Sequence, residues 1–164
     1  MANSLYASVP ELTTYAAERG VSLLGASGVD YTESEMRVFL RKAQDYVDLV
    51  FSFNGEAVYD DSAFPRYNLK DYDDTTVPPA VRRATLYIAC HLIEGLPILE
   101  GQKAQSEIKR EVVASNRIET EYATNYKDNT VQGYVMLDAP LYMLSRAGLL
   151  SGENTGFNMI GLRG

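Results

Sequence analysis

The stretch VPPAVRRATLYIACHLIEG, residues 77–95, decides the fold of this 164-residue chain. Pro79 is suited to the first position of a helix, because its fixed φ matches the helix and its missing N–H is not needed there. From Ala84 to Ile93 nearly every residue is apolar on all sides of the helical wheel, which is typical of a helix enclosed by others. We therefore predict a mainly α-helical (α+β) fold, a small helical bundle around this central buried helix.

Two amphipathic helices are predicted before the central helix. Ser8 and Glu11 form a capping box, in which the Ser8 hydroxyl accepts from the Glu11 N–H and the Glu11 carboxylate reaches back, and the helix ends at Gly20. Thr32 and Glu35 repeat the box, and apolar residues then recur at helical spacing to about Phe51. The polar residues that lie off this apolar stripe include Arg37, Arg41, Lys42 and Asp48.

One β-hairpin and a short helix are predicted after the central helix. The Gly-Leu-Pro sequence at residues 95–97 breaks the helix. Period-two alternation on both sides of residues 114–116 indicates a hairpin at about residues 106–123. A last helix begins with a cap at Asp138 and ends at Gly148.

Residues 54–76 read as a long polar loop, rich in tyrosine and aspartate. A loop of this length in a compact domain is usually functional or mobile. In its middle we expect Phe64 to pack inward, Pro65 to stiffen the turn and Arg66 to pair with a neighbouring carboxylate.

The chain is long enough for one domain with its own core and too short to argue for two. We expect a helical domain at residues 1–150 and an extended C-terminal arm at residues 151–164, where four glycines and spaced apolar residues show no periodicity. No apolar run approaches the roughly 18 residues of a membrane span, and the N-terminus lacks a signal-peptide pattern. Cys90 is the single cysteine, so no intramolecular disulfide is possible and we expect synthesis in a cytoplasm.

Composition and motifs argue against catalysis and against general nucleic-acid binding. The net charge is −7 and the pI near 4.7, without the basic domain or stripe of a nucleic-acid binder. We therefore expect no measurable affinity for single-stranded DNA at physiological salt. The lone His91 cannot supply the convergent ligands of a zinc site, and the acidic pairs after Tyr59 match no calcium-binding loop. We expect no enzyme activity, no metal and no cofactor.

Several short segments occur in a recognisable order between about residues 8 and 147. They are Glu18-Arg19-Gly20, Arg41-Lys42-Ala43-Gln44-Asp45-Tyr46-Val47-Asp48, Phe64-Pro65-Arg66, Val77-Pro78-Pro79-Ala80-Val81-Arg82-Arg83-Ala84, and Ile108-Lys109-Arg110-Glu111 with Ile118-Glu119-Thr120-Glu121-Tyr122. Together they resemble a family of small tailed-bacteriophage proteins that act as head–tail connector adaptors. One branch of this family carries the label DnaT-like single-stranded-DNA-binding protein.

The resemblance implies a structural protein that assembles into a closed ring of about twelve subunits. Such a ring docks on the portal protein and joins it to the tail or to a stopper protein, while double-stranded DNA passes through the lumen without specific binding. The implied location is the neck of the virion, after synthesis in the host cytoplasm, and no catalysis is implied. Two alternatives stay open: a DnaT-like single-stranded-DNA-binding replication accessory protein and an unassigned soluble module.

Two groups of residues are candidate contacts. A heterologous ring interface needs complementary patches, and one polar face of the predicted hairpin carries mixed charge. Arg82 and Arg83 stand at a helix start, where the dipole disfavours cations, so they pair either with the acidic loop upstream or with an acidic surface of a partner subunit. The candidate subunit-interface residues are Arg82, Arg83, Lys109, Glu111, Arg117, Glu119 and Glu121. The candidate portal-binding residues in the arm are Phe157, Asn158, Met159, Ile160, Leu162 and Arg163.

Overall fold

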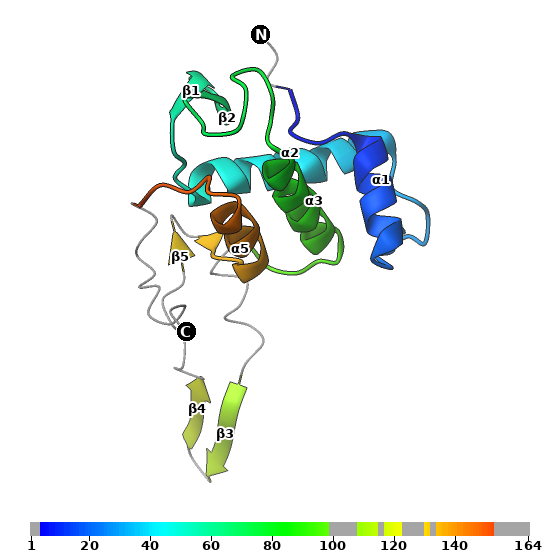
Figure 1. The fold of residues 1–164 in the computed structure, drawn as a ribbon. Coiled ribbons are helices and arrows are strands. Elements are labelled where there is room, and N and C mark those ends of the chain that lie inside the picture. Colours follow the sequence, from blue (N-terminus) through cyan, green and yellow to red (C-terminus); the bar gives the residue numbers. More distant parts are fainter. Residues whose placement is uncertain (1–3, 99–107, 115–116, 123–129, 132–133, 153–164) are drawn as a thin grey trace.

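The computed structural model describes residues 4–98, 108–114, 117–122, 130–131 and 134–152. Side chains are described outside the three short middle ranges. Within the described residues, four helices form the body of the molecule (Figure 1). They are α1 (Val9–Glu18), α2 (Glu33–Val50), α3 (Pro79–Ile93) and α5 (Asp138–Arg146).

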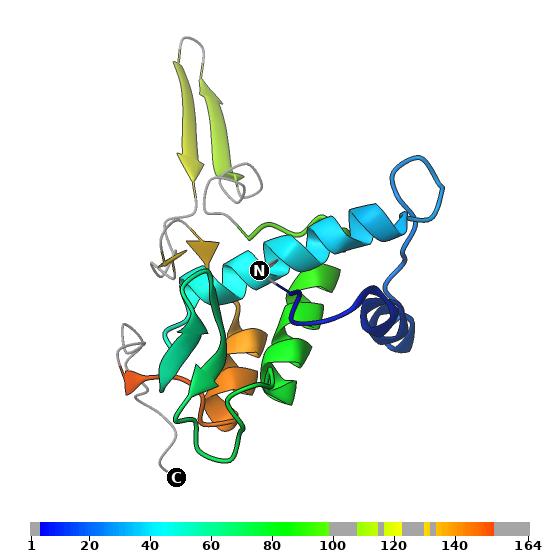
Figure 2. The same cartoon turned by 90° about the horizontal axis from the view of Figure 1, so that it is seen from above.

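The helix α3 is the central helix, as predicted. It begins at Pro79 and packs against α1, α2 and α5, and Figure 2 shows it between α5 on one side and α1 on the other. The Thr85 hydroxyl donates to the Val81 carbonyl at 2.9 Å, so this buried polar group is satisfied. The mainly α-helical (α+β) fold is confirmed. The buried side chains of α3 are Val81, Ala84, Thr85, Leu86, Ile88, Ala89 and Cys90.

Both predicted capping boxes are present. The Ser8 hydroxyl oxygen accepts from the Glu11 N–H at 3.4 Å, and the Glu11 carboxylate accepts from the Ser8 N–H at 2.7 Å. Thr32 and Glu35 make the same pair of bonds at 3.3 Å and 2.8 Å. Each box satisfies backbone donors that the first turn of a helix leaves without a partner. The predicted helices α1 and α2 are confirmed, and Gly20 follows α1 with a φ of +68°.

An antiparallel hairpin occupies part of the segment that we expected to be a loop. Its strands are β1 (Glu56–Tyr59) and β2 (Ser62–Tyr67). Phe64 is 1% exposed, so its inward packing is confirmed. Pro65 lies within β2 rather than in a turn, at a sheet edge where a missing N–H is tolerated. The expectation of a loop was wrong here, because Pro65 and the neighbouring aspartates hide the period-two pattern.

The guanidinium of Arg66 binds backbone carbonyls, and the expected pairing with a carboxylate was wrong among the described side chains. Its Nε donates to the Asn54 carbonyl at 2.7 Å, and its other nitrogens donate to the carbonyls of Gly55 at 2.7 Å, Ala63 at 3.1 Å and Phe53 at 3.3 Å. The chain between α2 and β1 runs beside β2, so its carbonyls face the guanidinium. Arg66 thereby fastens the hairpin to the end of α2.

Two further antiparallel pairs lie between α3 and α5 in the sequence. The first is the predicted hairpin, and Figures 1 and 2 show it extending away from the helices. The second is a short ladder that the sequence did not predict, so the expectation of a single hairpin was incomplete. The strands are β3 (Ile108–Ala114), β4 (Arg117–Tyr122), β5 (Thr130–Val131) and β6 (Tyr134–Val135).

The register of the β3–β4 hairpin divides its charged residues between two faces. Glu111 lies opposite Thr120, and Glu119 lies opposite Val112. Directly opposed residues share a face and successive residues alternate, so Glu111 and Glu119 occupy positions on opposite faces. The expectation of one mixed-charge face was therefore wrong, because it rested on alternation within each strand and not on the pairing.

The last helix begins with Asp138 as its first residue, and the expectation that Asp138 caps it was wrong. The N-cap is Leu137, and no side chain makes a capping bond there. Asp138 instead places a negative charge in the first turn, where the helix dipole favours it. After α5 the Ser151 N–H donates to the Ser52 carbonyl at 3.0 Å, so the chain returns to the C-terminal end of α2.

Candidate functional site

A groove of about 880 Å³ lies where the N-terminal segment crosses the starts of α1 and α2. Its walls come from residues 4–8, the beginning of α1, the first half of α2, and residues 75–77 ahead of α3, with Arg82 of α3 completing the lining. Three of its side chains are arginines, and we name it the arginine groove. Its charged lining residues are Glu11, Glu33, Arg37, Arg41 and Arg82.

The arginines give this groove a local excess of positive charge. The Arg37 guanidinium donates to one Glu33 carboxylate oxygen at 2.7 Å and 3.2 Å, and an Arg82 nitrogen lies 3.7 Å from a Glu11 oxygen. All four side chains are at least 42% exposed, and exposed ion pairs contribute little and are screened by salt. A phosphate could therefore compete for these guanidiniums. Three arginines against two glutamates leave an excess of one positive charge in a chain of net charge −7.

The two oxygens of the Glu11 carboxylate have different partners: Oε1 lies 3.7 Å from an Arg82 nitrogen, and Oε2 serves the capping box of α1. The Glu11 carboxylate already accepts from the Ser8 hydroxyl and from the Ser8 N–H, each at 2.7 Å. These bonds, more than the charge of Arg82, hold the pKa of Glu11 below its usual value. The helix start thus orients the carboxylate toward its own backbone, and the Arg82 guanidinium keeps donors for another acceptor.

The rest of the arginine groove is aliphatic or carries hydroxyls. Val38 is 51% exposed, and Thr75 and Thr76 lie on the opposite wall. Tyr6 also lines the groove but is only 3% exposed, so its ring is not available to stack on a base. The groove can offer contacts to phosphate and sugar groups, with aliphatic surface in place of a stacking platform.

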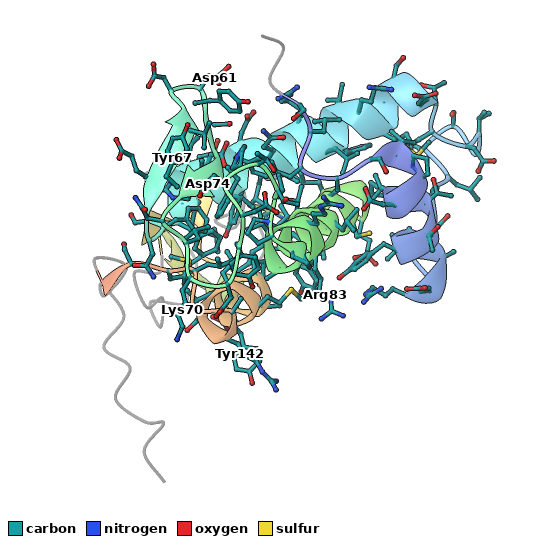
Figure 3. The ribbon with its side chains drawn as sticks, turned by 45° about the horizontal axis from the view of Figure 1, so that its top comes forward. Asp61, Tyr67, Lys70, Asp74, Arg83 and Tyr142 are labelled. Carbon is teal, nitrogen blue, oxygen red and sulfur yellow. The ribbon has the colours of Figure 1, made fainter. Side chains whose placement is uncertain are left out.

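A second groove, of about 1000 Å³, lies beneath the β1–β2 hairpin and has the opposite charge. One arginine, Arg66, faces four carboxylates there, which leaves an excess of three negative charges. Figure 3 shows Asp61 at the tip of this hairpin. A field of this sign repels phosphate, so of the two grooves only the arginine groove suits an anion. The four carboxylates of this acidic groove are Asp48, Glu56, Asp60 and Asp61.

The two arginines singled out at the start of α3 separate in the structure. Arg82 lies in the arginine groove and pairs with Glu11 of α1, so of its two predicted alternatives, pairing with the acidic loop upstream was wrong. Packing of α1 against α3 brings Glu11 closer to it than that loop. Arg83 is exposed, extends outward from α3 in Figure 3, and makes no ion pair within 4 Å among the described residues. The structure does not test a partner subunit at either residue.

The other predicted contact residues lie where little or nothing is described. The hairpin group belongs to β3 and β4, for which the structure gives backbone pairing only. The portal-binding group, Phe157 to Arg163, lies outside the described residues, as does all of the arm beyond Gly152. Both groups remain predictions. The hairpin group is Lys109, Glu111, Arg117, Glu119 and Glu121.

Sequence reasoning missed the part that Arg37 and Arg41 play. They were recognised only as polar residues off the apolar stripe of α2. Their spacing of one helical turn was a usable signal, since residues four apart share a helix face. Nothing in the sequence links them to Arg82, which joins them only because α3 packs against α2.

Cys90 is buried in α3, and His91 next to it is half-buried. Burial raises the pKa of the Cys90 thiol to about 11, so it is protonated at neutral pH. The His91 ring stacks on Tyr87, and its Nε2 lies 3.4 Å from the Pro97 carbonyl oxygen. Across the described ranges, no three His, Cys, Asp or Glu side chains are grouped to hold a metal ion. No helix in that same part of the chain is long and apolar enough to cross a membrane.

Comparison with known families places the chain. A family model described as "Putative DnaT-like ssDNA binding protein" matches residues 1–164. The chain belongs to this family. No curated protein and no solved structure matches it.

Proposed function

We propose that this protein binds single-stranded DNA weakly, through the arginine groove. The observation that carries the proposal is the match of the whole chain to a family described as DnaT-like single-stranded-DNA binding proteins. The groove supports it, because it gathers Arg37, Arg41 and Arg82 on one surface of an otherwise acidic protein. The proposal includes no catalytic activity and no cofactor.

The composition of the groove sets the kind of binding to expect. Single-strand binders combine a basic groove with stacking aromatics, and here the one lining tyrosine, Tyr6, is buried. Binding would therefore rest on phosphate contacts, and it would weaken steeply with salt. Three contacts at roughly −0.7 each give a slope of about −2 in log K against log salt. The net charge of −7 argues for no binding at all, and the same measurement decides between the two outcomes.

The test is fluorescence anisotropy of a labelled oligothymidylate at several salt concentrations. Wild-type protein should bind at low salt with a slope of about −2, and the double variant Arg37→Gln, Arg41→Gln should bind less tightly with a slope of about −0.7. The matched control is Arg146→Gln, at an exposed arginine of α5 that does not line the groove. Absence of binding at low salt, or binding that the double variant leaves unchanged, contradicts the proposal.

A second candidate function is a structural subunit of a phage head-to-tail connector ring. The β3–β4 hairpin favours it, because a two-stranded ribbon extending away from the helices is at best marginally stable alone. A neighbouring subunit that covers the ribbon would supply the missing contacts. In this proposal the ring has about twelve subunits, sits in the virion neck between the portal and the tail or stopper, and lets double-stranded DNA pass. The arm at residues 151–164 would then dock on the portal.

Assembly separates this candidate from DNA binding. Mass photometry should show a closed ring with one fixed subunit number, since a heterologous interface that closes gives a single size. The double variant Glu119→Lys, Glu121→Lys should weaken assembly while the circular dichroism spectrum stays normal. The control is Glu94→Lys, at an exposed residue after α3.

Truncation after Leu150 should leave a folded protein that no longer joins tails to filled heads. A monomer at every concentration contradicts the candidate, whereas tail attachment by the truncated protein would show that the arm is dispensable.

A further inference from the structure

One tyrosine fastens the N-terminal segment to the rest of the molecule. The Tyr6 N–H donates to the Gln44 side-chain carbonyl oxygen at 3.2 Å, and its hydroxyl donates to Asp48 at 2.7 Å. The same hydroxyl accepts from the Phe64 N–H at 2.9 Å, and the two rings meet edge to face with centroids 6.0 Å apart. Residues 4–8, which we name the N-terminal strap, are held on α2 and β2 chiefly by Tyr6, whose side chain is 3% exposed, and Ala7 is buried beside it.

This anchor lies between the two grooves. Tyr6 and the rest of the strap form one wall of the arginine groove, while Asp48 lines the acidic groove. The hydrogen bond between them therefore connects the walls of both grooves. Three charged groups act on Asp48: Arg41 and Asp45 from its own helix, and Arg66 from β2. Asp61 at the hairpin tip lines the same acidic groove.

We propose that the strap is a pH-sensitive latch on the arginine groove, seated more firmly when Asp48 is protonated and less firmly when Asp48 is ionised. The bond itself survives in both states. A protonated carboxyl still offers a carbonyl oxygen to the Tyr6 hydroxyl, and an ionised one offers a carboxylate oxygen. What changes is the cost of burying the charge.

The sign follows from the surroundings of Asp48. Burial, assisted by the negative charge of Asp45, raises its pKa to about 6, although the bonds from Tyr6 and from the Ala63 N–H and the charge of Arg41 oppose the rise. If the strap lifts, the half-buried Asp48 loses both the cover of the Tyr6 side chain and the Tyr6 bond; because burial is the larger cause, its pKa should fall toward the ordinary value of 3.8. The seated state thus binds the proton more tightly. The stabilisation that this proton gives the seated strap is complete below about pH 4 and is lost as pH rises through 6. The equilibrium constant between the seated and the lifted strap should therefore change roughly tenfold between pH 5 and 7.5.

Hydrogen exchange of the full chain tests the latch whatever the groove binds. Exchange in the peptide that covers residues 4–12, corrected for the intrinsic pH dependence of amide exchange, should slow about tenfold between pH 7.5 and 5. The variant Asp48→Asn carries a neutral, isosteric side chain and should show slow exchange at both pH values. The variant Glu94→Gln removes an exposed carboxylate that does not act on Asp48, and it should keep the pH dependence. A wild-type strap without this dependence, or an Asp48→Asn variant that retains it, overturns the proposal.

Discussion

The Tyr46 hydroxyl donates to the Val135 carbonyl at 2.6 Å, across 89 positions of the chain. It also accepts from the Leu137 N–H at 2.9 Å. The ring is fully buried and meets the Tyr134 ring edge to face at 5.7 Å. Burial raises the pKa of Tyr46 to about 12, so the hydroxyl remains a donor throughout the physiological range. The C-terminal half of α2 therefore holds the segment that leads into α5.

Replacing Tyr46 with phenylalanine should destabilise the protein. The ring stays, but the Val135 carbonyl and the Leu137 N–H lose their partner in a buried position. Leaving such groups unpaired should cost about 1–3 kcal/mol in the free energy of unfolding, measured by urea denaturation. Tyr142→Phe is the control, since Tyr142 is 59% exposed and extends outward from α5 in Figure 3. Equal stability of the two variants would argue against a structural role for the Tyr46 bonds.

The capping box of α2 supports a second prediction. Thr32→Ala removes the hydroxyl that accepts from the Glu35 N–H, and loss of an N-cap of this kind costs about 1 kcal/mol. The midpoint of urea unfolding should fall accordingly. Thr14→Ala, at an exposed position inside α1, should be neutral or slightly stabilising because alanine favours helix interiors. If Thr32→Ala unfolds like the wild type, the box contributes nothing measurable.

The helices could be predicted because their signals are local. Ser8 with Glu11 and Thr32 with Glu35 are three residues apart, and Pro79 marks its helix start unaided. Each pattern satisfies or avoids backbone donors within one turn, so no tertiary information is needed.

The β1–β2 hairpin and both grooves could not be predicted in this way. Arg66 gains its partners only because the chain before β1 runs beside β2, and backbone carbonyls leave no mark in the sequence. The arginine groove needs Arg82 to reach the face of α2 that carries Arg37 and Arg41, which the packing of α3 decides. The net charge, an average over the surface, concealed that local excess.

The loop before α3 supports a prediction about ionisation. The Asp73 carboxylate accepts from the Thr75 hydroxyl at 2.6 Å, from the Thr75 N–H at 2.8 Å and from the Thr76 hydroxyl. These bonds lower its pKa to about 2, so the stabilisation that they give is present above about pH 4 and is lost as pH falls toward 2. A carbon-detected NMR titration should place the Asp73 midpoint near 2. In Thr75→Val the midpoint should rise, and a wild-type midpoint at the ordinary value of 3.8 would rule out the capped loop.

Arg66→Lys should destabilise the β1–β2 hairpin, although it keeps the positive charge. The guanidinium donates in several directions to carbonyls of residues 53–55 and 63. A lysine ammonium is a single point with three donors and cannot reproduce that planar arrangement. Bonds from a charged donor contribute about 1.5–3 kcal/mol each. Water can replace some of them at this half-buried site, so the free energy of unfolding in urea should fall by about 1–3 kcal/mol.

Arg37→Lys is the matched control, because Arg37 is exposed and binds one Glu33 oxygen that lysine can also reach. This variant should change the free energy of unfolding by less than about 0.5 kcal/mol. Hydrogen exchange should locate the loss in residues 53–67, and an Arg66→Lys variant with wild-type exchange there would show that the carbonyl contacts do not hold the hairpin.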